Sequence, residues 1–128
     1  MAKSTSEIHL IRPEERTTET TQTSGMTREA AIASAGMWAG FVRTAPRMSS
    51  GWHHHGEQET SIYVLRGRLR LEFGSGGGAS VDAREGDFLH VPPAAIHRES
   101  NPADEEAHIV VVRAGTGPAV VNVDGPAG

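Results

Sequence analysis

The pattern of hydrophobic and polar positions along the chain is that of short β-strands separated by turns. From Arg68 to Phe73, polar and apolar residues alternate with a period of two, which is typical of a strand with one buried face. Ser61–Leu65 is rich in β-branched and aromatic residues, and residues 74–78 form a glycine-rich hairpin tip. Further strands are predicted at Met37–Thr44, Ala79–Ala83, Asp87–Val91, Ile96–Ser100, His108–Arg113 and Pro118–Val123. About ten short strands at this spacing predict an all-β sandwich or barrel.

The residues before the first strong strand predict less regular structure. Ile8–Ile11 is a candidate opening strand, and the threonine-rich residues 17–27 are expected to form a loop or an extended arm. A short helical turn is expected over Ala30–Ala33, because a threonine precedes it as a candidate N-cap and a glycine follows it. We therefore expect an N-terminal strand and arm over residues 1–36 and a barrel over residues 37–128, together forming one domain.

Composition limits the classes of protein that fit this pattern. The chain has 128 residues, of which 37% are hydrophobic and 5% aromatic, so a single core of mainly aliphatic side chains is expected. The formal net charge of −4 offers no basic excess for phosphates, which argues against a nucleic-acid partner. Cysteine is absent, which excludes disulfides and thiolate metal sites.

No segment of the sequence predicts membrane insertion or targeting. The first twenty residues carry charges of both signs and contain no apolar stretch. Apolar runs such as Ile109–Val112 are far shorter than a membrane span. We expect a soluble, cytoplasmic protein without a membrane partner.

Three of the seven histidines are consecutive. Alternate residues of a strand share a face, so His53 and His55 are expected to point together and His54 away from them. Two imidazoles about 6–7 Å apart along a strand can bind one metal ion. Glu59 follows four residues after His55 and offers a carboxylate oxygen. The alternative is a solvated, histidine-rich loop, and this segment alone does not decide between the two.

A second segment carries a specific spacing. Gly86, Pro92, His97 and Asn101 fit the pattern G-x5-P-x-G-x2-H-x3-N, with Ala94 at its second glycine position. This segment resembles the second motif of the cupin superfamily, whose members are small double-stranded β-helix, or jelly-roll, barrels. His97 is therefore a third candidate metal ligand.

The first cupin motif, G-x5-H-x-H-x3,4-E-x6-G, matches the histidine-rich segment. Its two histidines fall on His53 and His55, its closing glycine on Gly67, and its glutamate near Glu59. Arg47 stands at the opening glycine position, where a positive φ would strain an arginine. We therefore expect the turn at Arg47 to differ from the usual one.

The glutamate position of the first motif is displaced in this chain. The length from His55 to Gly67 places it at Thr60, one residue after Glu59. A slip of one residue turns a side chain to the other face of a strand, unless a bulge restores its direction. We expect a β-bulge early in the following strand that aims Glu59 inward, with Glu57 as the fallback oxygen ligand. If Thr60 faces the metal instead, water completes a three-histidine site.

The resemblance covers roughly residues 37–113 and implies an all-β cupin double-stranded β-helix in a single domain. It implies one divalent transition metal, Fe, Mn, Ni, Co or Zn, held by His53, His55, Glu59 and His97. It also implies a homodimer as the commonest state. The function expected is that of a metal-dependent oxygenase, such as a dioxygenase, or an isomerase acting on a small oxygen-rich molecule. The alternative is a non-catalytic module that binds a small ligand through the metal.

Overall fold

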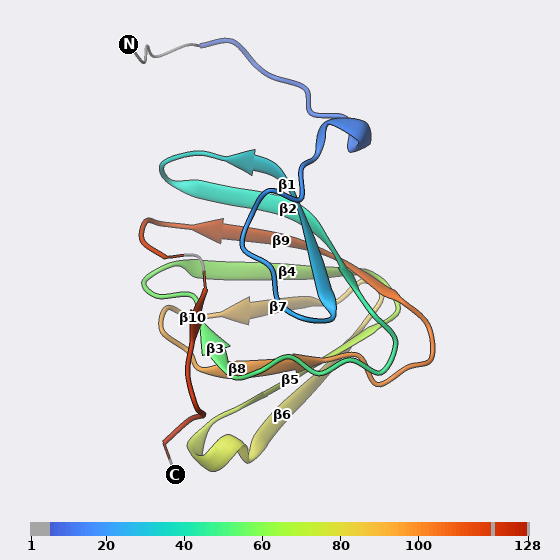
Figure 1. Ribbon diagram of the computed structural model, residues 1–128, viewed down its shortest axis with the longest axis vertical. Helices are drawn as coiled ribbons and strands as arrows, with labels where there is room; N and C mark the ends of the chain where they lie inside the picture. The colour runs from blue at the N-terminus through green and yellow to red at the C-terminus, as the bar shows by residue number, and fades with distance from the viewer. Residues whose placement is uncertain (1–5, 119, 128) are drawn as a thin grey trace.

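Two five-stranded antiparallel sheets face each other in the computed structural model, which describes residues 6–118 and 120–127 (Figure 1). The strand order is β1-β2-β9-β4-β7 in the first sheet and β10-β3-β8-β5-β6 in the second. The strands are β1 (Met26–Ala33), β2 (Met37–Thr44), β3 (His53–His54), β4 (Glu59–Arg66), β5 (Arg68–Phe73), β6 (Ala79–Arg84), β7 (Phe88–Val91), β8 (His97–Ser100), β9 (Ala107–Ala114) and β10 (Val121–Asn122). Two 3-10 turns, η1 (Pro13–Glu15) and η2 (Ser75–Gly77), are the helical elements of the described residues. Neither is long or apolar enough to cross a membrane.

The core lies between the inner faces of the two sheets. On β5, Leu69 and Leu71 are buried while their polar neighbours point outward, and β4 and β9 alternate in the same way. The core side chains are almost all aliphatic, as the composition predicted: Met26, Ala30, Trp38, Val42, Ile62, Val64, Leu69, Leu71, Ala83, Val91, Ile109 and Val111. The expected all-β barrel is confirmed, and so are the bounds expected for β2 and β5.

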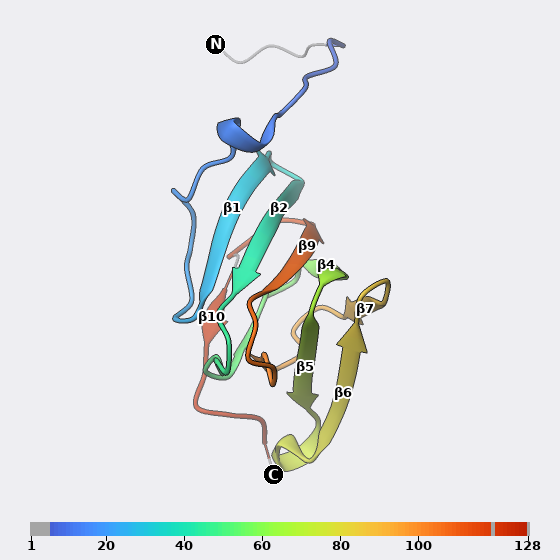
Figure 2. The same ribbon diagram turned by 90° about the vertical axis from the view of Figure 1, so that its right-hand side faces the viewer.

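The N-terminal predictions are wrong in two places. Ile8–Ile11 forms no strand; it is exposed, and Figure 1 shows this part of the chain extending away from the sheets. Ala30–Ala33 is not helical but ends β1, which forms a hairpin with β2. Met26, Arg28 and Ala30 face the interior at a period of two, so burial in the sheet outweighs the local preference for a helical turn. Figure 2 shows the two strands lying side by side.

The turn at Arg47 keeps the left-handed conformation that the motif assigns to glycine. Arg47 and Ala94, which replace the motif glycines, both have φ of 59°. The Arg47 N–H donates to the carbonyl oxygen of Ala103 (3.1 Å), and the Ala94 N–H donates to that of Gly56 (2.7 Å). The expectation of a different turn at Arg47 is wrong, because tertiary hydrogen bonds hold both residues in this region.

Candidate metal centre

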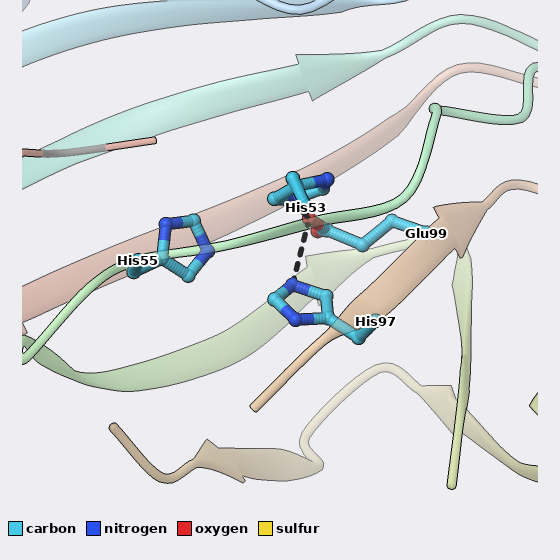
Figure 3. A group of neighbouring side chains, drawn as sticks. All are labelled: His53, His55, His97 and Glu99. Atoms are coloured by element: carbon cyan, nitrogen blue, oxygen red, sulfur yellow. Dashed lines mark hydrogen bonds and ion pairs between the residues drawn. The ribbon is translucent and has the colours of Figure 1, made fainter. Parts of the chain in front are cut away.

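The candidate site lies on the inner face of the second sheet, where β3 meets β8. His53 pairs directly with His97 across these two strands, and His55 follows β3. Glu99 lies two residues after His97 on β8, so both side chains point to the same face. All four side chains are buried and converge in Figure 3. We refer to His53, His55, His97 and Glu99 as the histidine–glutamate cluster.

The ligand atoms of the cluster are close enough to share one ion. One nitrogen of each imidazole and one carboxylate oxygen all lie within 4.8 Å of one another. The centroids of the three imidazole rings are 4.5–5.2 Å apart. Three imidazoles and one carboxylate are ligands that Fe, Mn, Ni, Co and Zn accept, and they leave positions open for a small molecule on a five- or six-coordinate ion.

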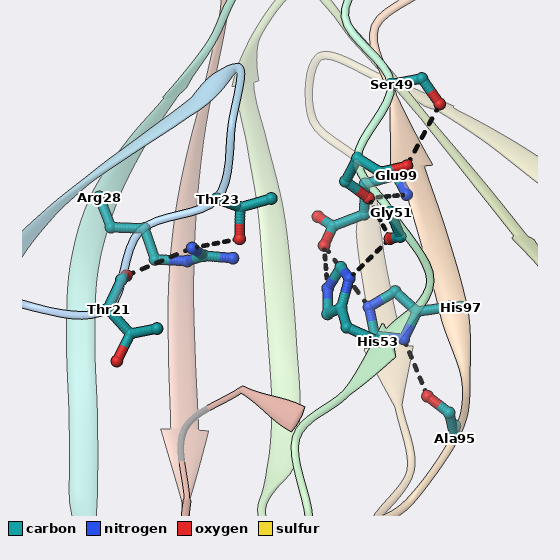
Figure 4. A network of polar contacts seen from close by, with 10 residues as sticks. Thr21, Thr23, Arg28, Ser49, Gly51, His53, Ala95, His97 and Glu99 are labelled. Carbon is teal, nitrogen blue, oxygen red and sulfur yellow. Dashed lines mark hydrogen bonds and ion pairs between the residues drawn. The ribbon is translucent and has the colours of Figure 1, made fainter. Parts of the chain in front are cut away.

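Backbone carbonyls fix the tautomers of two of the histidines. His53 Nδ1 donates to the carbonyl oxygen of Gly51 (3.0 Å), and His97 Nδ1 donates to that of Ala95 (2.9 Å), as Figure 4 shows. Because a carbonyl oxygen only accepts, the hydrogen of each neutral ring sits on Nδ1. The Nε2 lone pairs therefore face the cluster, in the arrangement that metal-binding histidines use.

These lone pairs face a carboxylate. Glu99 Oε2 lies 3.1 Å from His53 Nε2 and 3.5 Å from His97 Nε2. His97 Nε2 is buried and makes no hydrogen bond at that distance. A lone pair held against a carboxylate oxygen in a low-dielectric interior is repelled unless a proton or a metal cation lies between them. The residues of the cluster therefore fit a bound cation.

The ionisation of the cluster follows from the same contacts. Burial would raise the pKa of Glu99, but its contacts with His53 and His97 outweigh burial and hold this pKa well below its ordinary value. Burial would lower the pKa of His97, but the carboxylate of Glu99 and the Ala95 carbonyl raise it overall. In the metal-free cluster these contacts therefore favour the anionic form of Glu99 and the protonated form of His97.

Glu59 is not brought to the cluster. It lies on the outer face of β4, where its carboxylate contacts His90 Nε2 at 2.5 Å and is exposed. The β4 register is irregular between Val64 and Arg66, too far along the strand to turn Glu59 inward. The prediction that an early bulge aims Glu59 at the metal is wrong. Thr60 takes the inward position that the motif length assigned to it.

The other residues of the histidine-rich segment follow the alternation of a strand. His53 and His55 are buried in the cluster, whereas His54 is half-buried outside it, as predicted. The ring of His54 accepts a hydrogen bond through Nδ1 from the Gly56 N–H (2.9 Å). Glu57, the fallback ligand, is exposed in the turn that follows, so it does not replace Glu59.

Glu99 is the cluster residue that the sequence did not single out. It lies within the predicted strand Ile96–Ser100, two residues after His97, so alternation alone places both side chains on one face. The cupin motif places the carboxylate ligand in the histidine-rich segment, so the motif does not predict Glu99. The alternation along β8 was the signal that identifies Glu99.

Two buried arginines lie on the first sheet, facing the interior beside the cluster. Arg28 Nη1 donates to the Thr21 carbonyl (3.3 Å) and to Thr23 Oγ1 (2.8 Å), as Figure 4 shows. Burial, together with the charge of Arg28, lowers the pKa of Arg113 to about 10, against an opposing effect of Glu99. Both guanidinium groups are therefore positively charged at neutral pH.

An apolar pocket leads from the surface to the cluster. It has a volume of about 340 Å³, lies between β5, β6 and β7, and reaches His97. Its lining is Leu71, Phe73, Val81, Phe88, Leu89, His90, Val91, Pro92, Ala95 and His97. A mostly apolar pocket of this size that ends at a few polar groups is typical of small-molecule sites.

The fold and the site together define a class of protein: a β-barrel of two facing sheets, with three histidines and a glutamate inside it that could bind one metal ion. Residues 40–113 match the family model described as a cupin domain, and the chain belongs to the cupin family. No match is found among curated proteins.

Solved structures confirm the double-stranded β-helix. An uncharacterised conserved protein with a double-stranded β-helix domain from Klebsiella pneumoniae is 16% identical, with a TM-score of 0.71 over 91% of this chain and 98% of the other. The polyketide cyclase RemF from Streptomyces resistomycificus is 20% identical, with a TM-score of 0.75 over 91% of this chain and 86% of the other. The oxalate decarboxylase of Bacillus subtilis is 23% identical, with a TM-score of 0.67 over 80% of this chain. This chain corresponds to only 28% of the decarboxylase. At these identities the likeness shows the fold.

Proposed function

We propose that this cupin is a metal-dependent enzyme, of the oxygenase or isomerase class, that acts on a small oxygen-rich molecule. The observation that carries the proposal is the histidine–glutamate cluster, in which three imidazole nitrogens and one carboxylate oxygen, all buried, lie within 4.8 Å of one another. A divalent metal bound there would act as a Lewis acid on oxygen atoms of the substrate.

The chain's own residues have defined parts in this proposal. The carbonyls of Gly51 and Ala95 hold the rings of His53 and His97 with Nε2 toward the ion. Glu99 supplies the negative charge that offsets part of the charge of a divalent ion. The apolar pocket at His97 would admit the substrate and exclude bulk water from the site.

The similar structures support a small, oxygen-rich substrate. An oxalate decarboxylase and an oxalate oxidase in complex with the substrate analogue glycolate share this fold, at 23% and 24% identity. Oxalate and glycolate are small acids that are rich in oxygen. This likeness makes such molecules the first to test.

One observation favours the alternative of a non-catalytic binding module. Within residues 6–118 and 120–127, Glu99 is the only buried carboxylate, and the proposal uses it as a metal ligand. No second buried carboxylate of the described chain is therefore left to act as a general acid or base. Such a module would bind the metal and the ligand without turnover.

The test is metal analysis followed by an activity assay on the full chain. The purified protein is expected to hold about one ion per chain, and His53→Ala to abolish this while His54→Ala, the matched control, retains it. Oxygen uptake or isomerisation is then measured with diketones, catechols and hydroxy acids. Loss of metal in both variants, or no metal in the parent protein, would contradict the proposal. Bound metal with ligand binding but no turnover would select the non-catalytic module.

We also propose a cytoplasmic homodimer, following the resemblance to cupins. Light scattering on the eluting protein is expected to give about twice the chain mass of 13.6 kDa. A mass equal to one chain would contradict the dimer.

A further inference from the structure

The apolar pocket enters the barrel between the edges of the two sheets. β7 is the last strand of the first sheet and β6 the last strand of the second, and residues of both line the pocket. Phe88 is 72% exposed, which places it at the outer end. Leu71, Val91 and His97 are 4%, 4% and 2% exposed, which places them at the inner end. The pocket is therefore open to solvent at one end and closed inside the protein at the other.

His97 belongs both to the pocket and to the histidine–glutamate cluster. Its ring is held by the hydrogen bond from Nδ1 to the carbonyl oxygen of Ala95, and Ala95 also lines the pocket. A molecule that fills the pocket therefore has its inner end beside the cluster. The rest of that molecule lies against the pocket wall.

The wall of the pocket is suited to an apolar group. Eight of its ten lining residues are apolar, and the other two are His97 and His90. The ring of His90 is largely exposed and contacts the carboxylate of Glu59. No lysine or arginine of the described chain lines the pocket. A charged or hydroxyl-rich group placed there would lose its water and gain few hydrogen bonds in return.

The size of the pocket limits the size of this apolar group. The volume is about 340 Å³, whereas a closed cavity of about 150 Å³ holds one benzene molecule. One six-membered ring with a short oxygen-bearing end therefore fits. A molecule as small as glycolate would leave most of the apolar wall without contact, so it would gain little from burial.

We propose that the ligand of this pocket carries an apolar body of about one six-membered ring, attached to an oxygen-bearing end that lies at His97. That the oxygen-bearing end reacts at the cluster rests on the proposed function. The preference for an apolar body rests on the pocket. The proposal narrows the substrate class from small oxygen-rich molecules in general to those with one apolar ring.

A protein partner is the competing occupant of the pocket. Phe73, Val81 and Phe88 are exposed at its outer end, and exposed apolar side chains can also form a protein contact. A partner that covers this outer end has no need to reach Leu71 and Val91. A ligand that fills the pocket does reach them, so these two side chains separate the two occupants.

The first experiment compares three hydroxy acids with the same oxygen-bearing end. Glycolate has no body, mandelate has a phenyl ring, and gluconate has a hydroxyl-rich chain of similar size. Calorimetric titration of the full-length protein loaded with Co²⁺ measures each affinity. Mandelate is expected to bind at least about tenfold more tightly than glycolate, because its ring is buried. Gluconate is expected to bind no more tightly than glycolate.

A matched pair of variants tests whether the pocket causes this preference. Leu89 lines the pocket and is half-buried, whereas Leu65 is exposed and lies outside it. Leu89→Gln should remove most of the advantage of mandelate over glycolate, since it places an amide in the apolar wall. Leu65→Gln makes the same exchange and should leave the advantage unchanged.

A second measurement needs neither a variant nor a metal. In metal-free, methyl-labelled parent protein, benzyl alcohol is expected to shift the methyl resonances of Leu71 and Val91, because its ring would lie against them. Glycolate is expected to leave both in place. The measurement also covers the case in which Leu89→Gln does not fold.

Three results would overturn the proposal: equal affinities for mandelate and glycolate, an undiminished advantage of mandelate in a folded Leu89→Gln variant, or unmoved methyl resonances of Leu71 and Val91. Any of these with metal bound leaves the proposed function standing. Benzyl alcohol bound at Leu71 and Val91 in a protein that takes up no metal supports the apolar preference and contradicts the proposed function.

Discussion

Glu99 determines the charge of the candidate site. It is buried between His53 and His97, and the contacts with both hold its pKa well below the ordinary value. The carboxylate is therefore ionised throughout the neutral range, ready to bind a cation without losing a proton. Glu59, by contrast, is an exposed carboxylate whose partner is an exposed histidine on the outer face.

This contrast gives a paired prediction. Glu99→Gln should weaken metal binding by at least about 100-fold, because loss of a direct ligand costs no less than loss of an outer-shell partner. Glu59→Gln should change it by less than about twofold, since exposed charges contribute little. Calorimetric titration with Co²⁺ or Mn²⁺ measures both. An equal effect of the two substitutions would show that the cluster does not hold the ion.

The raised pKa of His97 predicts an effect of pH on the metal-free protein. A proton on His97 stabilises the folded state, so its contribution is complete below the ordinary pKa of 6.5 and is lost as pH rises through the raised pKa. The free energy of unfolding of metal-free protein should therefore fall as pH rises from about 6.5. Urea melts across this range measure it.

Bound metal should remove that dependence, because a metal-bound His97 has no proton to lose. Because the ion and the proton compete for His97, metal affinity should rise over the same pH interval. The metal-free slope should be smaller in His97→Gln than in the parent protein. A parent protein whose stability is flat or increases above pH 6.5 would refute the assigned shift.

At the scale of elements, two tight turns each contain a residue in the left-handed backbone conformation, with a positive φ. Ala94 has φ of 59°, where an alanine costs about 1 kcal/mol, while Gly67 has φ of 87° and lies against Ala107. Ala94→Gly should raise the free energy of unfolding by about 0.5 kcal/mol. Glycine has no left-handed strain in the folded state, and this gain exceeds the cost of its greater entropy in the unfolded chain. Gly67→Ala should lower it by more than about 1 kcal/mol, because the new Cβ would lie 3.0 Å from that of Ala107.

Urea denaturation of both variants tests the turn prediction. The two substitutions exchange the same residue types in opposite directions, so each controls for the other. A loss of stability in Ala94→Gly would contradict the argument.

The elements best predicted from the sequence are those whose own pattern carries the signal. β5 has the expected bounds because its period-two alternation matches its burial, and the bounds of β2 are also those expected. β1 was missed because its alanines suit a helical turn locally, and only pairing with β2 makes it a strand. The three histidines follow from motif spacing and alternation. The motif length correctly assigned the inward position to Thr60, and the error lay in the bulge expected to turn Glu59 inward. That bulge is absent because β4 pairs in regular register with β7 and β9 from Glu59 to Val64, which the sequence alone does not reveal.

At the scale of the whole molecule, the cluster links segments that are distant in the sequence. His53 and His55 precede β4, whereas His97 and Glu99 lie on β8, and the buried arginines face them from the first sheet. An ion bound by the cluster is therefore bound only by the folded barrel, so binding and folding are coupled.

This coupling predicts a metal-dependent melting temperature. At a free metal concentration 100 times the dissociation constant, the stabilisation is about 2.7 kcal/mol, which corresponds to about 10 °C for a domain of this size. Thermal melts with added metal and with chelator measure the difference. The His53→Ala variant should show none of it. A midpoint that chelator leaves unchanged in metal-loaded protein would contradict the coupling.

Anomalous X-ray diffraction from crystals of the metal-loaded protein tests the central claim most directly. The account predicts one anomalous peak per chain, inside the barrel, about 2.0–2.3 Å from one nitrogen each of His53, His55 and His97 and from a carboxylate oxygen of Glu99. A peak at the outer pair of Glu59 and His90, or no peak among the three histidines, would contradict it.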